Sequence, residues 1–298
     1  MGSAVDIEIE GRHLSLSNLD KVLYPSGFTK AQVIDYMARI APVAVPHLTG
    51  RALTFRRYPD GSDTAGFFEK RCPGHRPPWV GVALGPGDRR GGIEYCRIDE
   101  TAAMVWAANM AALELHAPMA LARALDVPRA LVFDFDPGAP AALRECCEIA
   151  LAARVVLDSV DLRGWCKTSG SKGLQMYVPL NTPGASHDGA ADFALAVGQL
   201  LERQMPGRVT TVMAKAERPG KIFVDWSQNA LHKTTIAPYS LRARPTPTVS
   251  TPVTWDEVET AAAGTLDLTF TASDVLDRVE QHGDLFAEVL TVAQQLPL

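Results

Sequence analysis

The stretch Ala130-Leu-Val-Phe-Asp-Phe-Asp-Pro-Gly138 decides how the rest of the chain is interpreted. Its apolar residues 131–133 favour a short β-strand, which the Pro-Gly pair ends. Residues two apart on a strand point to the same face, so Asp134 and Asp136 should project together. Two carboxylates on one face repel each other unless a cation lies between them, and Mg²⁺ and Mn²⁺ prefer such oxygen ligands. Taken alone, the stretch is equally consistent with a strand that ends in an acidic Asp-Pro-Gly turn.

The composition is that of an ordinary globular protein. The chain has 298 residues, of which 47% are hydrophobic and 21% charged, enough for one large domain or two lobes. Its net charge of −5 argues against general nucleic-acid binding but leaves room for a local basic patch. No apolar run approaches the length of a membrane span and no signal-peptide pattern is present. We therefore expect a cytoplasmic protein with no membrane partner.

The cysteines predict neither a disulfide framework nor a zinc site. There are five of them, an odd number, and no pair has the C-x-x-C spacing of zinc ligands. They occur at Cys72, Cys96, Cys146, Cys147 and Cys166.

Helix-like and strand-like patterns alternate along the chain, which predicts an α/β or α+β fold. Thr29 should cap a helix over 30–41 that Pro42 and Pro46 end. Residues 73–92 resemble loops, and a helix from Asp99 to about 115 should end at His116. Further helices are expected at about 140–157, 188–205 and 273–295, and strands at 53–58, 165–168, 174–180 and 222–226.

Two segments could complete an active site with the acidic strand. In Lys167-Thr-Ser-Gly-Ser-Lys-Gly173, small residues would let backbone N–H groups approach an anion, although a flexible turn is the alternative. Walker A spacing is absent. Asp225 stands at the end of another predicted strand, where it is either a structural hydrogen-bonding group or the third carboxylate of a two-metal site. Lys233, Arg242 and Arg244 follow it and suit phosphates, or a solvated face.

Three motifs in this order resemble those of archaeo-eukaryotic primases, and most closely the polymerase domain of bacterial DNA ligase D. They are Phe133-Asp-Phe-Asp-Pro, Thr168-Ser-Gly-Ser-Lys-Gly-Leu and Val224-Asp-Trp-Ser-Gln-Asn. The resemblance extends from about Leu16 to Gly283. It implies a mixed α/β (α+β) fold, with an RRM-like catalytic sheet flanked by helices and a smaller N-terminal lobe. Residues 1–298 would form one domain, with lobes at about 1–115 and 116–285.

The same resemblance assigns roles to individual residues. Asp134, Asp136 and Asp225 would hold two Mn²⁺ or Mg²⁺ ions and carry out catalysis. The incoming triphosphate would contact Arg56, His116, Ser169, Lys172, Gln175, Arg242 and Arg244. Asn18, Lys21 and Lys30 would bind a 5′-phosphate on DNA, and Phe67 and Phe68 would stack on template bases.

One position departs from the family pattern. The family usually has a histidine where this chain has Gln175. A glutamine can still donate a hydrogen bond to an anion, but it stays neutral where a histidine can carry charge.

These features predict a template-directed, metal-dependent nucleotidyltransferase that extends a primer 3′-hydroxyl and fills short gaps, preferring ribonucleotides. Its expected partners are DNA with 5′-phosphorylated gaps or ends, NTP or dNTP, and, in end joining, Ku and a DNA ligase. We expect a stand-alone, nucleoid-associated protein. Two alternatives are a non-catalytic module that binds DNA ends and an Asp-x-Asp phosphatase. The phosphatase would normally have Thr or Val where this chain has Pro137.

Overall fold

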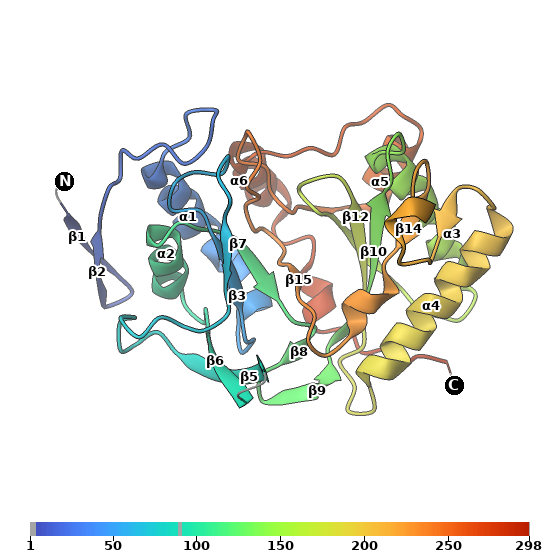
Figure 1. The fold of residues 1–298 in the computed structure, drawn as a ribbon, viewed down its shortest axis with the longest axis horizontal. Coiled ribbons are helices and arrows are strands. Elements are labelled where there is room, and N and C mark those ends of the chain that lie inside the picture. Colours follow the sequence, from blue (N-terminus) through green and yellow to red (C-terminus); the bar gives the residue numbers. More distant parts are fainter. Residues whose placement is uncertain (1–3, 89–90, 298) are drawn as a thin grey trace. The chain divides into compact units, whose positions relative to one another are not determined.

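The computed structural model describes residues 4–88 and 91–297, which form two compact units of mixed α/β structure (Figure 1). The first unit comprises Met1–Pro118 with two later segments, Thr234–Ser250 and Phe270–Asp284. The second comprises Met119–Lys233, Thr251–Thr269 and Leu285–Leu298. The mixed α/β class predicted from the sequence is confirmed. The sequence did not indicate that two segments beyond residue 233 return to the first unit.

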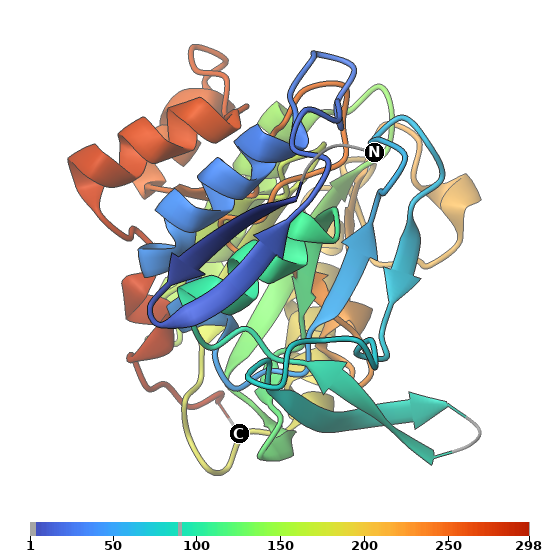
Figure 2. The ribbon, with the colours of Figure 1, turned by 90° about the vertical axis from the view of Figure 1, so that its left-hand side faces the viewer.

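A four-stranded antiparallel sheet in the order β15-β7-β3-β4 organises the first unit. A hairpin of β1 and β2 lies beside helices α1 and α2 (Figure 2). The elements of this unit are β1 (Val5–Ile9), β2 (Arg12–Leu16), α1 (Lys30–Leu48), β3 (Thr54–Arg57), β4 (Phe67–Glu69), β5 (Val82–Asp88), β6 (Gly91–Cys96), α2 (Thr101–Asn109), β7 (Ala112–Ala117), β15 (Thr235–Ile236) and α6 (Ala272–His282).

Helix α1 begins where the sequence predicts but ends seven residues later than expected. Thr29 caps it, with its hydroxyl accepting from the Gln32 amide in a capping box. The helix continues through Pro42 and Pro46 to Leu48. The two prolines are four residues apart and both exposed, so they share the solvent face of the helix. Water can hydrogen-bond the carbonyls that lose a donor there, which is why the prolines do not end the helix.

The segment predicted as loops contains a hairpin and a disulfide. Strands β5 and β6 pair antiparallel, and Figure 2 shows this hairpin extending away from the four-stranded sheet. Cys72 and Cys96 form a disulfide, so the prediction of unpaired cysteines was wrong. Their Cα atoms are 4.8 Å apart because the Cys72 amide donates to the Glu94 carbonyl beside β6. Counting cysteines could not reveal a pair separated by 24 positions.

His116 lies on a strand rather than at the end of a helix. Helix α2 ends at Asn109, Ala111 adopts a positive φ of 57°, and β7 follows directly. The run from 101 to 117 is almost wholly buried. A fully buried strand and a fully buried helix have the same apolar pattern, so periodicity could not separate them. The last predicted helix is also shorter than expected, because α6 ends at Gly283, whose φ is +67°.

A six-stranded sheet in the order β13-β14-β10-β12-β11-β16 forms the centre of the second unit. Helices α3 and α4 both contact β10, and α3 also packs against α5 (Figure 1). The elements are β8 (Ala120–Leu121), β9 (Ala124–Pro128), β10 (Ala130–Pro137), α3 (Leu143–Asp158), β11 (Trp165–Thr168), β12 (Leu174–Pro179), α4 (His187–Gln204), β13 (Val209–Thr210), η1 (Lys215–Glu217), β14 (Ile222–Val224), η2 (Trp226–Asn229), β16 (Pro252–Val253), α5 (Trp255–Ala262) and η3 (Ala287–Leu290).

The acidic strand lies inside this sheet. β10 pairs antiparallel with β12 on one side and with β14 on the other. The side chains of Leu131, Val132, Phe133 and Phe135 are fully buried, so a short apolar run is enough to place the strand in the core. None of the helices in residues 4–88 and 91–297 is long and apolar enough to span a membrane.

Candidate active site

Three aspartates lie on or directly after the paired strands β10 and β14 of the second unit. Asp134 and Asp136 lie on β10, and Asp225 follows β14 directly. The Asp225 amide donates to the Asp134 carbonyl with an N–O distance of 2.9 Å. This bond extends the strand pairing, in which Phe135 faces Val224. The sheet ladder itself thus brings Asp225 opposite Asp134, although the two residues are distant in sequence. Asp225 follows its strand as predicted, whereas Asp134 and Asp136 lie within β10, which continues to Pro137.

Burial and mutual repulsion act strongly on Asp134, which is 8% exposed. Burial raises its pKa most, the charges of Asp136 and Asp225 raise it further, and the resulting pKa is about 7. A hydrogen bond from Gln175 and the charge of Lys167 act in the opposite direction. The site therefore concentrates negative charge in a place where water compensates little of it.

Lys167 and Gln175 support Asp134 from the neighbouring strands. Gln175 on β12 stands opposite both Asp134 on β10 and Lys167 on β11. The Lys167 ammonium is fully buried and donates to Gln175 Oε1 at 2.6 Å. Since that oxygen accepts from a lysine, the amide NH₂ of Gln175 is the group that donates to Asp134. The sequence did not predict this role of Lys167, because no local pattern distinguishes a buried lysine on a strand.

Asp225 is held by the turn that follows it. Its Oδ1 accepts from the Ser227 amide at 3.1 Å and from the Ser227 hydroxyl at 2.6 Å, and its Oδ2 accepts from Gln228 Nε2 at 3.2 Å. These bonds hold the carboxylate in one orientation. They also turn it toward its own helix η2, for which it is the N-cap residue.

The donor chemistry of the three aspartates fits a divalent cation. They supply only oxygen ligands, and their repulsion at Asp134 is what a cation would relieve. Within the described part of the chain, however, no group of three His, Cys, Asp or Glu side chains is close enough to hold a metal ion. Asp225 in particular would have to exchange some of its bonds to Ser227 and Gln228 for metal coordination.

The Ser169–Gly173 loop approaches the acidic strand closely. Ser169 Oγ accepts from the amides of Ser171 at 3.3 Å and Gly173 at 3.0 Å, which closes a compact turn. A Cβ atom on Gly173 would lie 2.4 Å from the Phe135 carbonyl oxygen, so only glycine fits there. Lys172 beside it is exposed. The loop therefore has a fixed backbone close to the acidic strand, and its Lys172 side chain is exposed to solvent.

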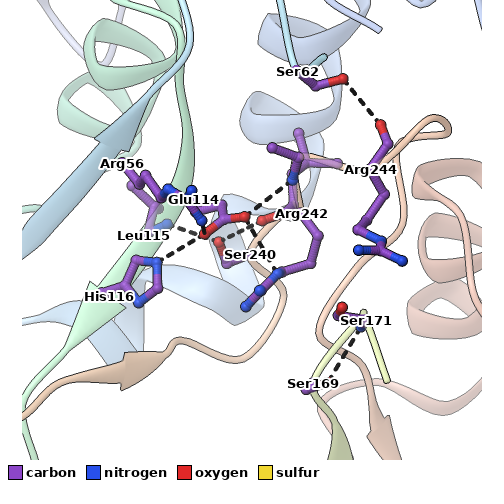
Figure 3. A network of polar contacts seen from close by, with 12 residues as sticks. Arg56, Ser62, Glu114, Leu115, His116, Ser169, Ser171, Ser240, Arg242 and Arg244 are labelled. Atoms are coloured by element: carbon purple, nitrogen blue, oxygen red, sulfur yellow. Dashed lines mark hydrogen bonds and ion pairs between the residues drawn. The ribbon is translucent and has the colours of Figure 1, made fainter. Parts of the chain in front are cut away.

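The first unit contains a separate cluster around Glu114, a residue whose role the sequence did not reveal (Figure 3). This carboxylate is 1% exposed. It contacts His116 Nε2 at 3.0 Å, Arg242 Nε at 3.4 Å and Arg56 Nη1 at 3.7 Å. The Ala243 amide donates to it at 3.1 Å. Three residues predicted to bind the triphosphate are thus brought together by one buried acid.

The pKa values in this cluster follow from those contacts. Burial pushes the pKa of Glu114 upward, but the bond from His116, the charges of Arg242 and His116, and the Ala243 amide outweigh it and bring the pKa to about 2. Burial lowers the pKa of His116, against the influence of Glu114. Glu114 is therefore ionised throughout the physiological range. Arg244, the other predicted contact, is exposed, and its carbonyl accepts from Ser62 Oγ.

Phe67 and Phe68 are exposed by 45% and 57%. Arg57 lies over the Phe67 ring at 5.4 Å and Arg56 over the Phe68 ring at 5.1 Å. Phe68 also meets His116 edge to face at 5.5 Å. Two neighbouring aromatic residues that face solvent on β4 are not core residues, and the guanidinium groups beside them suit a stacking surface for bases.

The proposed 5′-phosphate residues converge through their backbones. The Lys21 amide donates to the Asn18 carbonyl at 3.1 Å, and the Lys30 amide donates to the Lys21 carbonyl at 2.8 Å. The ammonium of Lys30 donates to the Ser17 carbonyl at 2.6 Å. Burial lowers the pKa of Lys30, and the charges of Lys21 and Arg57 lower it further. Carboxylates offset part of this charge, because Lys21 pairs with Asp60 at 3.3 Å and Arg57 pairs with Glu69 at 3.1 Å.

The predicted nucleotide-binding residues are thus divided between the two units. Arg56, His116 and Arg242 surround Glu114 in the first unit, together with Arg244 on the same chain segment. Ser169, Lys172 and Gln175 accompany the aspartates in the second.

Comparison with known proteins identifies the family. Residues 29–286 match the sequence profile of the family described as LigD, primase-polymerase domain. The chain belongs to the LigD primase-polymerase domain family. Its relatives include the multifunctional non-homologous end joining protein LigD of Mycolicibacterium smegmatis, which is 45% identical over 275 residues, covering 91% of this chain and 35% of that protein.

Other relatives agree with this family. The LigD protein of Mycobacterium bovis is 42% identical over 296 residues, covering 96% of this chain and 37% of its own length. Among solved structures, the polymerase domain of Mycobacterium tuberculosis ligase D in complex with DNA is similar with a TM-score of 0.86 at 41% identity. That similarity covers 94% of this chain and 99% of the other. The chain spans only about a third of the length of these two LigD relatives.

Membership of the LigD family confirms the resemblance inferred from the three motifs. The residues that the sequence missed, Glu114 and Lys167, are both buried and charged. The only signal for Glu114 was its place two residues before His116, which puts both side chains on one face once the segment is known to be a strand.

Proposed function

We propose that this protein is a template-directed, divalent-metal-dependent nucleotidyltransferase that extends a primer 3′-hydroxyl. It fills short gaps in DNA with 5′-phosphate recognition, prefers ribonucleotides and acts in DNA repair by end joining. The observation that carries the proposal is the pairing of β10, which bears Asp134 and Asp136, with β14, which places Asp225 opposite Asp134. The mycobacterial polymerase domain, whose structure includes DNA, supports DNA as the substrate.

Two Mn²⁺ or Mg²⁺ ions held by these aspartates would stabilise the attacking and leaving oxygens of an in-line displacement at the α-phosphate. Asp225 is the carboxylate suited to accept the proton of the primer 3′-hydroxyl. Its bonds to Ser227 and Gln228 fix the position of the carboxylate. Gln175 keeps Asp134 oriented by donating to it.

The incoming triphosphate carries several negative charges, which the cations of the chain offset. The residues that would contact it are Ser169, Lys172, Gln175, Arg56, His116, Arg242 and Arg244. Guanidinium groups suit this task because they donate in pairs to phosphate oxygens.

The DNA would be held by two further groups. Lys21 and Lys30, with Asn18, suit a terminal 5′-phosphate, since a dianionic group gains more than a bridging phosphate from two ammonium ions. Phe67 and Phe68 suit stacking on template bases without sequence preference. Ku and a DNA ligase are the partners that end joining would supply.

The test is extension of a gapped, 5′-phosphorylated duplex with Mn²⁺ and NTPs. The wild type is compared with the double variant Asp134→Ala/Asp136→Ala, and with Asp192→Asn, which changes an exposed aspartate on α4. We expect extension by the wild type and the control and none by the double variant. Binding of the duplex without extension by the wild type would instead indicate a DNA-end-binding module. Phosphate release from a phosphomonoester would indicate a phosphatase.

A further inference from the structure

Glu114 carries one charge but has two guanidinium groups and an imidazole as partners. Arg56 stands directly opposite it across the antiparallel pair β3 and β7, and His116 follows two residues later on the same face. Arg242 comes from a distant segment whose Ala243 amide also donates to this carboxylate. One buried acid therefore joins β3, β7 and the 240–243 segment in a single polar cluster (Figure 3).

The positive charge of this cluster is not fully compensated within the described structure. Two guanidinium groups and an imidazole face one carboxylate. The Nε atom of Arg56 is buried and has no hydrogen-bond partner among the described residues, and the buried Nε atom of Arg242 has only its 3.4 Å ion pair with Glu114. The two side chains remain partly exposed, by 34% and 19%. Groups with donors still available at the edge of a buried cluster suit an anion from solvent.

Glu114 also determines which nitrogen of His116 remains for a ligand. His116 Nε2 lies 3.0 Å from Glu114 Oε2. Since Glu114 is acceptor-only when ionised, Nε2 carries the proton in this pair, and only Nδ1 can face a further partner. The carboxylate thereby orients the ring, in the same way that it orients the two guanidinium groups.

We propose that Glu114 is a positioning residue, which arranges Arg56, His116 and Arg242 into one preformed receptor for the polyphosphate of the incoming nucleotide. The inference rests on the proposed function, because it assigns these cations to the triphosphate. It adds a specific cause: without the buried carboxylate, the two neighbouring guanidinium groups repel each other, and these partly exposed groups turn toward water.

The direction in which anion affinity changes when Glu114 is neutralised shows whether Glu114 positions the cations or only weakens the local positive field. A carboxylate that only weakens the local positive field would, once neutralised, let an anion bind more tightly. A carboxylate that positions the cations would, once neutralised, let it bind more weakly. We expect Glu114→Gln to weaken binding about tenfold, the loss typical of a charge-assisted contact.

The experiment measures binding of a non-hydrolysable nucleoside triphosphate with Mn²⁺ by calorimetry, and primer extension in parallel. Glu114→Gln is compared with the wild type and with Glu69→Gln. Glu69 lies in the same sheet and pairs with Arg57 at 3.1 Å, outside the cluster. Circular dichroism verifies that each variant is folded. Glu114→Asp provides a second test, because it keeps the charge but withdraws the oxygens from their partners.

A double-mutant cycle shows whether Glu114 acts through Arg242. If it does, Glu114→Gln should lower the affinity much less in an Arg242→Met background than in the wild type. The Nε2 proton of His116, followed by NMR in ¹⁵N-histidine-labelled protein, should lose its hydrogen-bonded shift in Glu114→Gln. A purely structural loss would not produce this coupling.

Three outcomes are possible. Weaker binding by both Glu114 variants, with Glu69→Gln unchanged, supports the inference. Equal or tighter binding by Glu114→Gln overturns it and leaves the proposed function intact. A wild type that binds no triphosphate overturns both.

Discussion

Gln175 lies directly opposite Asp134 across β10 and β12, and its side chain donates a hydrogen bond to the Asp134 carboxylate. On its other side it accepts from the buried ammonium of Lys167 at 2.6 Å. A neutral amide thus transmits the influence of a buried cation to an aspartate of the active site. Gln175, which stands where the family usually has a histidine, therefore completes a chain of hydrogen bonds from Lys167 to Asp134.

Replacing Gln175 by leucine removes both bonds while keeping the side chain buried and of similar size. We expect extension to slow about 10- to 100-fold, since a hydrogen bond to a charged group contributes roughly 1.5–3 kcal/mol. Gln175→His should retain most of the activity, because a histidine can also donate to Asp134. The measurement is single-turnover extension of the gapped duplex. Equal rates for Gln175→Leu and the wild type would contradict the proposed role.

Asp134 predicts a specific dependence of stability on pH in metal-free protein. Its pKa of about 7 exceeds the ordinary value, so the folded state binds more protons than the unfolded state between about pH 4 and 7. Stability from this group is therefore fully present below about pH 4 and is lost as the pH rises from about 4 to 7.

The variant Asp134→Asn removes that loss. We expect it to be more stable than the wild type at pH 8 by roughly 1–3 kcal/mol and to show a clearly smaller advantage at pH 5. Urea unfolding in the presence of a chelator measures both values. Asp192→Asn, which changes an exposed aspartate, is the control. An advantage of the same size at pH 5 and pH 8 would show that repulsion at Asp134 is not the cause.

Lys21 and Lys30 should determine the preference for a 5′-phosphate. We expect Lys21→Ala/Lys30→Ala to bind a 5′-phosphorylated gap at least tenfold more weakly and to bind a 5′-hydroxyl gap almost unchanged. Each lost phosphate contact should also reduce the slope of log affinity against log salt by about one. Fluorescence anisotropy at several salt concentrations measures both effects, with Arg203→Ala on α4 as the control. Equal weakening for both gaps would place the 5′-phosphate elsewhere.

Phe68 should contribute to template binding through its exposed ring. Phe68→Leu keeps an apolar side chain but removes the aromatic face on which a base would stack, so we expect affinity for a gapped duplex to fall by about 1–3 kcal/mol. The loss should be similar for different template sequences, because every base has such a face. Phe28→Leu, at a partly buried aromatic residue that packs against the core of the same unit, is the control. A sequence-dependent loss would favour direct base contacts instead.

The disulfide between Cys72 and Cys96 is open to direct measurement. The intact protein under non-reducing conditions should be two mass units lighter than after reduction, which reflects the two hydrogens of one disulfide. Because the disulfide closes a loop over 24 positions, Cys72→Ser should lower the free energy of unfolding by roughly 3 kcal/mol. The buried thiol change Cys147→Ser is the control for loss of a sulfur atom in the core.

The local sequence alone was sufficient to predict the acidic strand and the first residues of several helices. Residues 131–133 are apolar and β-favouring, so β10 and the two aspartates on it could be predicted directly. Thr29 and Ser186 carry hydroxyls that cap the next turn, so the starts of α1 and α4 could be predicted as well. These features depend on neighbours in the sequence, which is why the sequence reveals them.

Other features depend on which segments meet in space. Pro42 does not end helix α1 because it faces water, which the tertiary structure decides. Leu113 and Leu115 lie on a strand rather than a helix because of the segments that pack over them. The disulfide joins residues whose distance no spacing rule gives.

The sequence by itself thus determined the family, the three aspartates and the set of cations around them, because these are matters of residue type and order. Only the tertiary structure decided how they are supported. Glu114 and Lys167 each become meaningful when strands from distant parts of the chain bury them beside opposite or polar partners. A buried charge is stable only with such partners, and the fold alone determines which side chains those are.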